Sequence, residues 1–116
     1  MTDPQTFDEF WPDYLAAHSD RRSRALHVAG TAAGLAFMLV FLATGHPGWA
    51  VAALVTGYGA AWTGHVLFER NIPKTLSHPL WSLRGDLRML RLALLGRLER
   101  EIARVQASAH ANQASD

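Results

Sequence analysis

A long uncharged stretch dominates the pattern of hydrophobic and polar positions, because residues 25–68 contain no Asp, Glu, Lys or Arg. Gly45-His46-Pro47-Gly48 divides it into two apolar runs of twenty residues, 25–44 and 49–68, and glycine and proline here indicate a turn. About 20 apolar residues are enough to cross a bilayer as a helix. We therefore predict an all-α fold centred on a two-span transmembrane helical hairpin.

A small soluble bundle with a buried hairpin is the alternative fold. A chain of 116 residues has little else to cover two fully apolar helices, so the pattern favours the membrane. Small residues would allow the two spans to pack closely in lipid. Gly30 and Gly34 lie four apart on one face of the first run, and Gly57 and Ala61 offer a similar strip in the second.

A short amphipathic helix is predicted before the hairpin. Thr6-Phe7-Asp8-Glu9 is typical of a capping box, in which side chains satisfy free backbone groups at the start of a helix. Phe10, Tyr14 and His18 follow at four-residue spacing and would share one face. His18 would then lie just outside the first span.

A basic amphipathic helix is predicted after the hairpin. Hydrophobic residues recur there every three or four positions from Leu80 to Val105, with arginines on the other faces. Such a helix suits the membrane surface or packing beneath the hairpin. The small and polar residues 108–116 are predicted to be a disordered tail, so residues 1–107 are expected to form a single helical membrane domain.

Basic residues gather at the open end of the hairpin and are absent from its turn. They are Arg21, Arg22 and Arg24 before the first run, and Arg70, Lys74, Arg84, Arg88 and Arg91 after the second. The positive-inside rule then places both termini in the cytoplasm. A formal net charge of only +1 gives no general affinity for nucleic acid, so no such partner is expected. The pattern leaves a homo-oligomer open.

The histidines are placed so that several can meet near the cytoplasmic surface. His27 lies seventeen residues before Thr44, and His65 lies sixteen after Trp49, so both would be roughly 25 Å from the turn at about 1.5 Å per residue. An antiparallel hairpin brings them to the same depth. His18 and His78 lie just outside the two spans, so four histidines can converge, whereas His46 in the turn and His110 in the tail cannot.

Glu69 follows His65 by four residues and would share its helical face. It could bind a metal together with His65 or orient the ring of His65 through its outer nitrogen. Three imidazoles and an oxygen ligand suit Fe(II), with positions left for dioxygen and substrate. Since the chain has no cysteine, thiolate ligands are excluded. The simpler interpretation is that these histidines are polar interface residues, Glu69 a solvated helix end, and Asp86 a surface charge.

Three motifs resemble those of the DUF962, or Mpo1-like, family, over residues 7–100. The first motif runs from Phe10 to Leu15, includes His18, and continues from Arg24 to Thr31. The second and most specific motif is Gly64-His65-Val66-Leu67-Phe68-Glu69-Arg70-Asn71-Ile72-Pro73. The third, Pro79 to Met89, resembles that of bacterial members, which implies a multi-pass protein of the bacterial inner membrane.

The resemblance implies an Fe(II)-dependent dioxygenase that converts a 2-hydroxy fatty acid and dioxygen into carbon dioxide and a fatty acid one carbon shorter. Carried onto this chain, it implies metal ligands at His18, His27 and His65, with His78 ranked below them. Glu69 and Asn71 match the rest of the second motif as catalytic candidates. Arg24 or Arg70 could neutralise the substrate carboxylate. The competing hypothesis is a non-enzymatic lipid-binding or scaffold protein, in which the histidines are incidental or structural.

Overall fold

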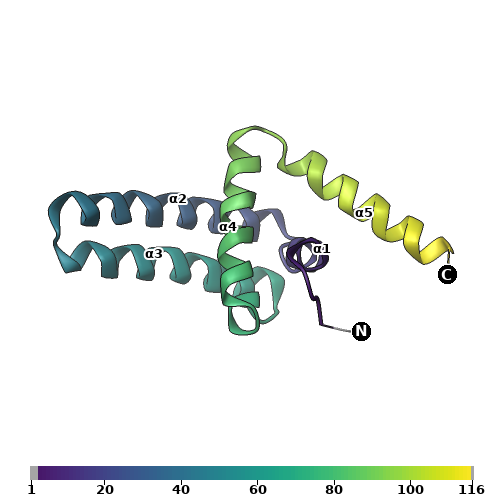
Figure 1. The fold of residues 1–116 in the computed structure, drawn as a ribbon, viewed down its shortest axis with the longest axis horizontal. Helices are drawn as coiled ribbons and strands as arrows, with labels where there is room; N and C mark the ends of the chain where they lie inside the picture. The colour runs from purple at the N-terminus through teal and green to yellow at the C-terminus, as the bar shows by residue number, and fades with distance from the viewer. Residues whose placement is uncertain (1–2, 116) are drawn as a thin grey trace.

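The computed structural model describes residues 3–115, which are predominantly helical and contain no strand (Figure 1). In chain order the elements are α1 (Phe7–Ala16), α2 (Arg21–Thr44), α3 (Pro47–Gly64), the π-helix η1 (His65–Glu69), the 3-10 helix η2 (Lys74–Leu76), α4 (Pro79–Leu94) and α5 (Leu98–Ser115). The predicted all-α fold built on a helical hairpin is thereby confirmed.

α2 and α3 form an antiparallel hairpin that projects from the other helices (Figure 1). Gly45 ends α2 in the left-handed conformation, with φ of 70°, which glycine adopts without a steric penalty. Pro47 begins α3, where the missing N–H leaves no hydrogen bond unmade. The turn therefore lies where glycine and proline predicted it.

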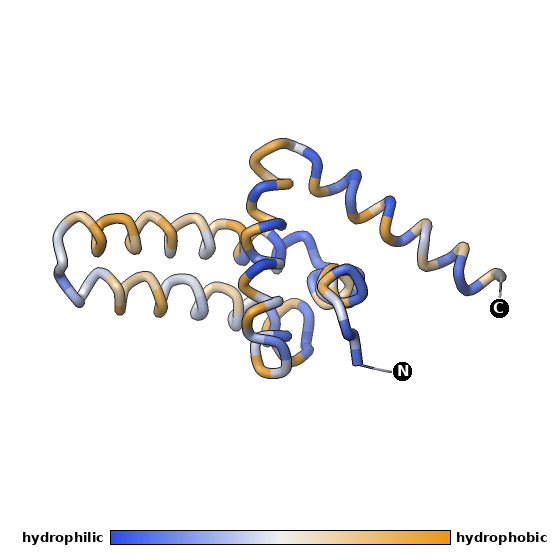
Figure 2. The backbone as a smooth tube through the Cα atoms, viewed as in Figure 1, coloured by the Kyte–Doolittle hydropathy of each residue, from blue (hydrophilic) through white to orange (hydrophobic). Residues whose placement is uncertain are grey.

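Both arms of the hairpin are long and apolar enough to cross a membrane, namely Arg21–Thr44 and Pro47–Glu69. Only 11% of the most apolar stretch of the first arm is buried, and 17% of that of the second. A core helix of a soluble bundle would bury most of this surface. Figure 2 shows hydrophobic residues along the hairpin and hydrophilic residues gathered at its open end, where both termini lie.

Glycines bring the two arms into close contact. A Cβ atom at Gly30 would lie 2.6 Å from Cβ of Ala60, and one at Gly34 would lie 3.2 Å from the carbonyl oxygen of Ala53. Gly34 also faces Gly57 across the interface. Gly30 and Gly34 of the first predicted strip therefore do meet Gly57 of the second, and Ala60 is a further close neighbour of Gly30.

We expect Gly30→Ala to destabilise the hairpin by about 1–3 kcal/mol, because the added methyl has no space and overpacking forces the helices apart. Unfolding in mixed micelles, followed by circular dichroism, measures this change. Gly59→Ala is the matched control, since a Cβ there meets no atom within 4 Å. Alanine favours helix over glycine by about 1 kcal/mol, so the control should be neutral or slightly more stable; equal stabilities for the two variants would contradict the close packing.

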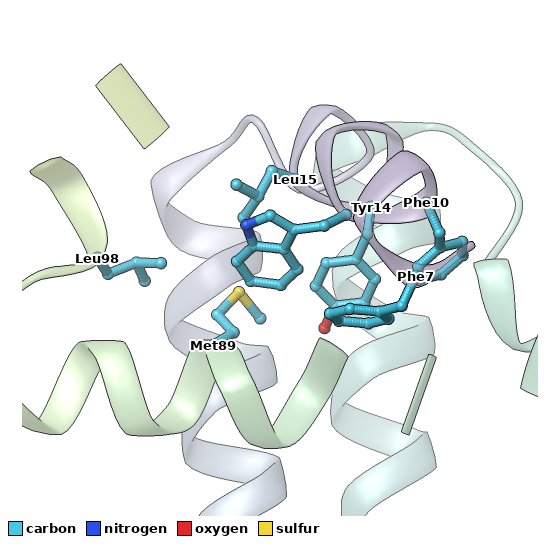
Figure 3. Close-up of a cluster of buried hydrophobic side chains, with 7 residues drawn as sticks. Phe7, Phe10, Tyr14, Leu15, Met89 and Leu98 are labelled. Atoms are coloured by element: carbon cyan, nitrogen blue, oxygen red, sulfur yellow. The ribbon is translucent and has the colours of Figure 1, made fainter. Parts of the chain in front are cut away.

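α1 lies at the open end of the hairpin, beside α4 and below α5 in the view of Figure 1, and contacts both. The hydroxyl of Thr6 accepts a hydrogen bond from the N–H of Glu9, which is one half of the predicted capping box. The carboxylate of Glu9 accepts from the N–H of Gln5, the residue before Thr6. The hydrophobic face of α1 meets residues of α4 and α5 in a core of buried side chains (Figure 3): Phe7, Phe10, Trp11, Tyr14, Leu15, Met89 and Leu98. This core fixes α1 and α4 against the base of α2.

The basic segment after the hairpin is two helices rather than the one predicted. Gly96 adopts a φ of 70° between α4 and α5, and the N–H of Arg97 bonds to the carbonyl of Leu92. The hydrophobic spacing continues across this break, so periodicity alone did not reveal it. α5 extends to Ser115, where the sequence predicted a disordered tail from residue 108. Alanines at 107, 109, 111 and 114, without glycine or proline, favour this continuation.

Candidate metal centre

Three histidines from separate elements meet at the open end of the hairpin. His18 lies in the loop after α1, His27 on α2, and His65 at the start of η1, and each side chain is buried. The ring of His18 lies 4.7 Å from that of His27 and 4.5 Å from that of His65, between centroids. One nitrogen from each of the three residues lies within 4.8 Å of the corresponding nitrogens of the other two, a spacing that could hold one metal ion.

One nitrogen of each ring forms a hydrogen bond with an oxygen acceptor. The pairs are His18 Nδ1 with the carbonyl oxygen of Tyr14 (2.7 Å), His65 Nδ1 with Oδ1 of Asn71 (2.6 Å), and His27 Nε2 with Oδ1 of Asp86 (2.5 Å). An oxygen acceptor fixes the proton on the nitrogen that faces it, which leaves a lone pair on the other nitrogen. Metal-binding histidines in proteins are commonly held in this way.

Two of the remaining nitrogens are buried without any partner. Nε2 of His18 and Nδ1 of His27 make no hydrogen bond, and a buried polar atom left so costs about 1–3 kcal/mol. Burial, with a further contribution from His27, lowers the pKa of His18 to about 3, so its ring is neutral near pH 7. A neutral imidazole with a free lone pair, such as that of His18, is a ligand for a metal such as iron or zinc.

Asp86 joins the site, although its position in the sequence suggested a surface charge. Its Oδ1 accepts a hydrogen bond from the phenol of Tyr14 (2.6 Å) as well as from His27. Burial, and then the charge of Asp86, raise the pKa of Tyr14 well above its usual value, which keeps the phenol a donor. The sequence does contain a signal for Asp86 as a site residue, because it is the single acidic residue between positions 79 and 97, a segment rich in arginine.

Gly85 allows Tyr14 to reach Asp86, because a Cβ at Gly85 would lie 3.0 Å from the Tyr14 ring. We expect Gly85→Ala to displace the ring, to cost about 1–3 kcal/mol of stability, and to weaken metal binding several-fold through Asp86 and His27. Thermal melting and an anaerobic titration with Co(II), a spectroscopic substitute for Fe(II), measure the two effects. Gly59→Ala again serves as the control. Unchanged melting and unchanged affinity would show that the Tyr14 contact is unimportant.

Glu69 lies apart from the three histidines. Its carboxylate accepts hydrogen bonds from the N–H of Asp20 (2.6 Å) and the hydroxyl of Ser19 (3.0 Å), so it connects η1 to the loop before α2. Glu69 was predicted to share a helical face with His65; it is the last residue of the π-helix η1, and its carboxylate bonds to this loop and not to the His65 ring. Asn71 contacts His65 instead: its Oδ1 pairs with Nδ1 of His65, and its Nδ2 donates to the carbonyl of Ala17.

The other predicted site residues lie outside this group. Arg24 is buried and donates to the carbonyls of His18 and Ser19 (2.9 and 2.8 Å), so it holds the loop that carries His18. Arg70 is exposed in the left-handed conformation that ends η1. The ring of His78 stacks on Trp81, with centroids 5.2 Å apart, and is not one of the three grouped histidines.

One comparison with known proteins identifies the family. The sequence matches the model of the family described as "2-hydroxy-palmitic acid dioxygenase Mpo1-like" over residues 4–98. No curated protein and no solved structure matches. The matched segment covers most of the chain and contains all three grouped histidines and Asp86. The chain therefore belongs to the Mpo1-like family.

Proposed function

We propose that this protein is an Fe(II)-dependent dioxygenase of 2-hydroxy fatty acids. The observation that carries the proposal is the buried group of His18, His27 and His65, in which one nitrogen of each ring is held by an oxygen and the other nitrogens of His18 and His27 have no partner among the described residues. The family is described by a dioxygenase of 2-hydroxy-palmitic acid, which supplies the substrate class. Histidine nitrogens with few other ligands are typical of iron sites that react with dioxygen.

The overall reaction breaks the bond between C1 and C2 of the substrate. One 2-hydroxy acid and one dioxygen give one carbon dioxide, one water and a carboxylic acid one carbon shorter. Bound to His18, His27 and His65, Fe(II) would supply one-electron chemistry with dioxygen and open positions for the substrate's carboxylate and hydroxyl oxygens.

The surrounding residues position the ligands and hold protons. Asp86 keeps the proton of His27 on Nε2, and Tyr14 donates to the same carboxylate oxygen. Asn71 keeps the proton of His65 on Nδ1 in the same way, with an amide oxygen as the acceptor in place of a carboxylate. Arg24 holds the His18 loop from behind. Arg70, which is exposed, is the better candidate to meet the substrate carboxylate.

The placement of the hairpin supports a lipid-like substrate. With the two apolar arms in the bilayer, the arginines at their open end favour a cytoplasmic location for both termini, in the bacterial inner membrane. The histidine group lies at that end, at the level where the head of a fatty acid would lie. Reporter fusions at either terminus test the orientation, and a reporter active only in the periplasm should stay silent at both.

Metal content and oxygen uptake test the enzymatic proposal. Protein purified without added zinc or nickel, then loaded anaerobically with Fe(II), should bind about one iron per chain. It should consume dioxygen with 2-hydroxypalmitic acid, release carbon dioxide and form the acid one carbon shorter, but should not act on palmitic acid. A protein that binds no iron would refute the proposal. A triple His→Gln variant at positions 18, 27 and 65 should lose iron and turnover together, whereas a scaffold would keep its membrane role.

A further inference from the structure

An apolar groove runs along one side of the hairpin and ends at the metal centre. It has a volume of about 290 Å³, and α2, α3 and α4 all contribute to its lining. His27, His65 and Asp86 line its polar end, and Met38 and Leu54 line its far end, toward the turn. The groove therefore joins the candidate ligands to the apolar surface of the hairpin.

The groove has the length of one leaflet of a bilayer. His27 and Met38 are eleven residues apart on α2, which corresponds to about 16 Å at 1.5 Å per residue. The hydrocarbon core of a bilayer is about 30 Å thick. A chain lying in the groove would thus run parallel to the lipid chains, from the membrane surface to about its middle.

Small residues make the groove possible. Gly30, Gly34 and Gly57 are in its lining, and the absence of side chains at Gly30 and Gly34 lets α2 and α3 pack closely along it. Tyr58 and Trp62 of α3 also line it. Asp86 is the one charged side chain in the lining. The shape and the polarity fit an amphiphile with one apolar chain and a metal-binding head.

We propose that this groove binds the acyl chain of the 2-hydroxy fatty acid, so that the substrate enters sideways from the cytoplasmic leaflet. The head lies against His27, His65 and Asp86, and the far end at Met38 and Leu54 limits the length of chain that is accommodated. The inference rests on the proposed function for its substrate class, while the apolar part of the groove is lined by residues outside the histidine group.

Gly57→Leu tests the groove, with Gly59→Leu as the matched control on the same helix. A Cβ at Gly57 meets only the carbonyl oxygen of Gly30, at 3.8 Å, so the larger side chain would extend into the groove. A Cβ at Gly59 meets nothing and lies outside the groove. The ratio of kcat/KM for long-chain over short-chain 2-hydroxy acids should fall on the order of tenfold in Gly57→Leu. The ratio should stay unchanged in Gly59→Leu, and equal ratios in the two variants would overturn the proposal.

Photo-cross-linking of wild-type protein gives a readout independent of turnover. A 2-hydroxypalmitic acid with a diazirine at its chain end, bound to the whole protein in lipid nanodiscs, should label residues near Met38 and Leu54. Unlabelled 2-hydroxypalmitic acid should suppress this labelling. If labelling succeeds without iron or oxygen uptake, the dioxygenase proposal fails while the groove stands.

Other patterns of labelling would overturn the groove. Labelling spread over the outer faces of α2 and α3 would place the chain in bulk lipid. Labelling that a phosphatidylcholine carrying the same diazirine reproduces, and that the hydroxy acid does not suppress, would show that membrane lipid occupies the groove. Protection of the groove by a second copy of the chain, seen as a dimer that Gly57→Leu abolishes, would also refute the proposal.

Discussion

Replacing His65 with alanine is expected to remove bound iron and to reduce turnover of 2-hydroxypalmitic acid by at least about 100-fold. Altering a residue that only orients a metal ligand already lowers metal affinity or activity by about 10–100-fold. His65 is buried, lies 4.5 Å from the ring of His18, and has Nδ1 fixed by Asn71, so its other nitrogen is available to a metal. With two imidazoles left, the site lacks the ligands to retain Fe(II). Iron content by mass spectrometry and oxygen uptake measure the two losses.

His78→Ala is the control for this experiment. His78 is partly exposed, stacks on Trp81 and lies outside the histidine group, so its variant should keep iron and turnover. Because removal of a buried ring can also loosen the fold, helical content should be compared for both variants, and free imidazole should be added to His65→Ala as a replacement ligand. A His65→Ala protein that is folded and retains one iron per chain would exclude His65 as a ligand.

The hairpin and the meeting of its histidines could be predicted because they depend on hydrophobicity, turn residues and residue spacing, which are read directly from the sequence. The uncharged residues 25–68 and the Gly-Pro turn determine two antiparallel helices of known length. Counting residues from that turn then places His27 and His65 at one depth, and the structure brings both together with His18. None of these steps needed knowledge of how distant segments pack.

The features that were missed depend on local backbone geometry or on tertiary contacts. The carboxylate of Glu69 bonds to the loop before α2 and is not part of the histidine group, and Gly96 divides one predicted helix into two without a change in hydrophobic spacing. Asp86 lies 59 residues after His27 in the sequence. Only the packing of α4 across the base of the hairpin, guided by Tyr14 against Gly85, brings its carboxylate to the ring.

The three histidines are held by three different parts of the fold. A backbone carbonyl of α1 holds His18, the side-chain amide of Asn71 after η1 holds His65, and a carboxylate of α4 holds His27. Helices α1 and α4 pack together in the aromatic core, so the geometry of the histidine group depends on that core as well as on the hairpin.

Asp86→Asn is expected to weaken Fe(II) binding by about 10–100-fold, the usual effect of altering a group that orients a metal-binding histidine. The carboxylate can only accept a hydrogen bond from Nε2 of His27, whereas an asparagine can turn its NH₂ group toward that nitrogen. The ring would then carry its proton on Nδ1, the nitrogen that is otherwise buried without a partner among the described residues. Competition with a chelator of known affinity measures the change, and a Co(II) spectrum reports the loss of a nitrogen ligand.

Glu69→Gln is the matched control, because it makes the same chemical change in a carboxylate that contacts Ser19 and Asp20 instead of a histidine. An amide oxygen can still accept from the backbone N–H of Asp20, so iron affinity should change by less than about threefold. If Glu69→Gln weakens binding as much as Asp86→Asn, Glu69 is closer to the metal than its hydrogen bonds indicate. If Asp86→Asn binds iron as wild type does, Asp86 serves Tyr14 and the packing of α4, and His27 needs no carboxylate to bind metal.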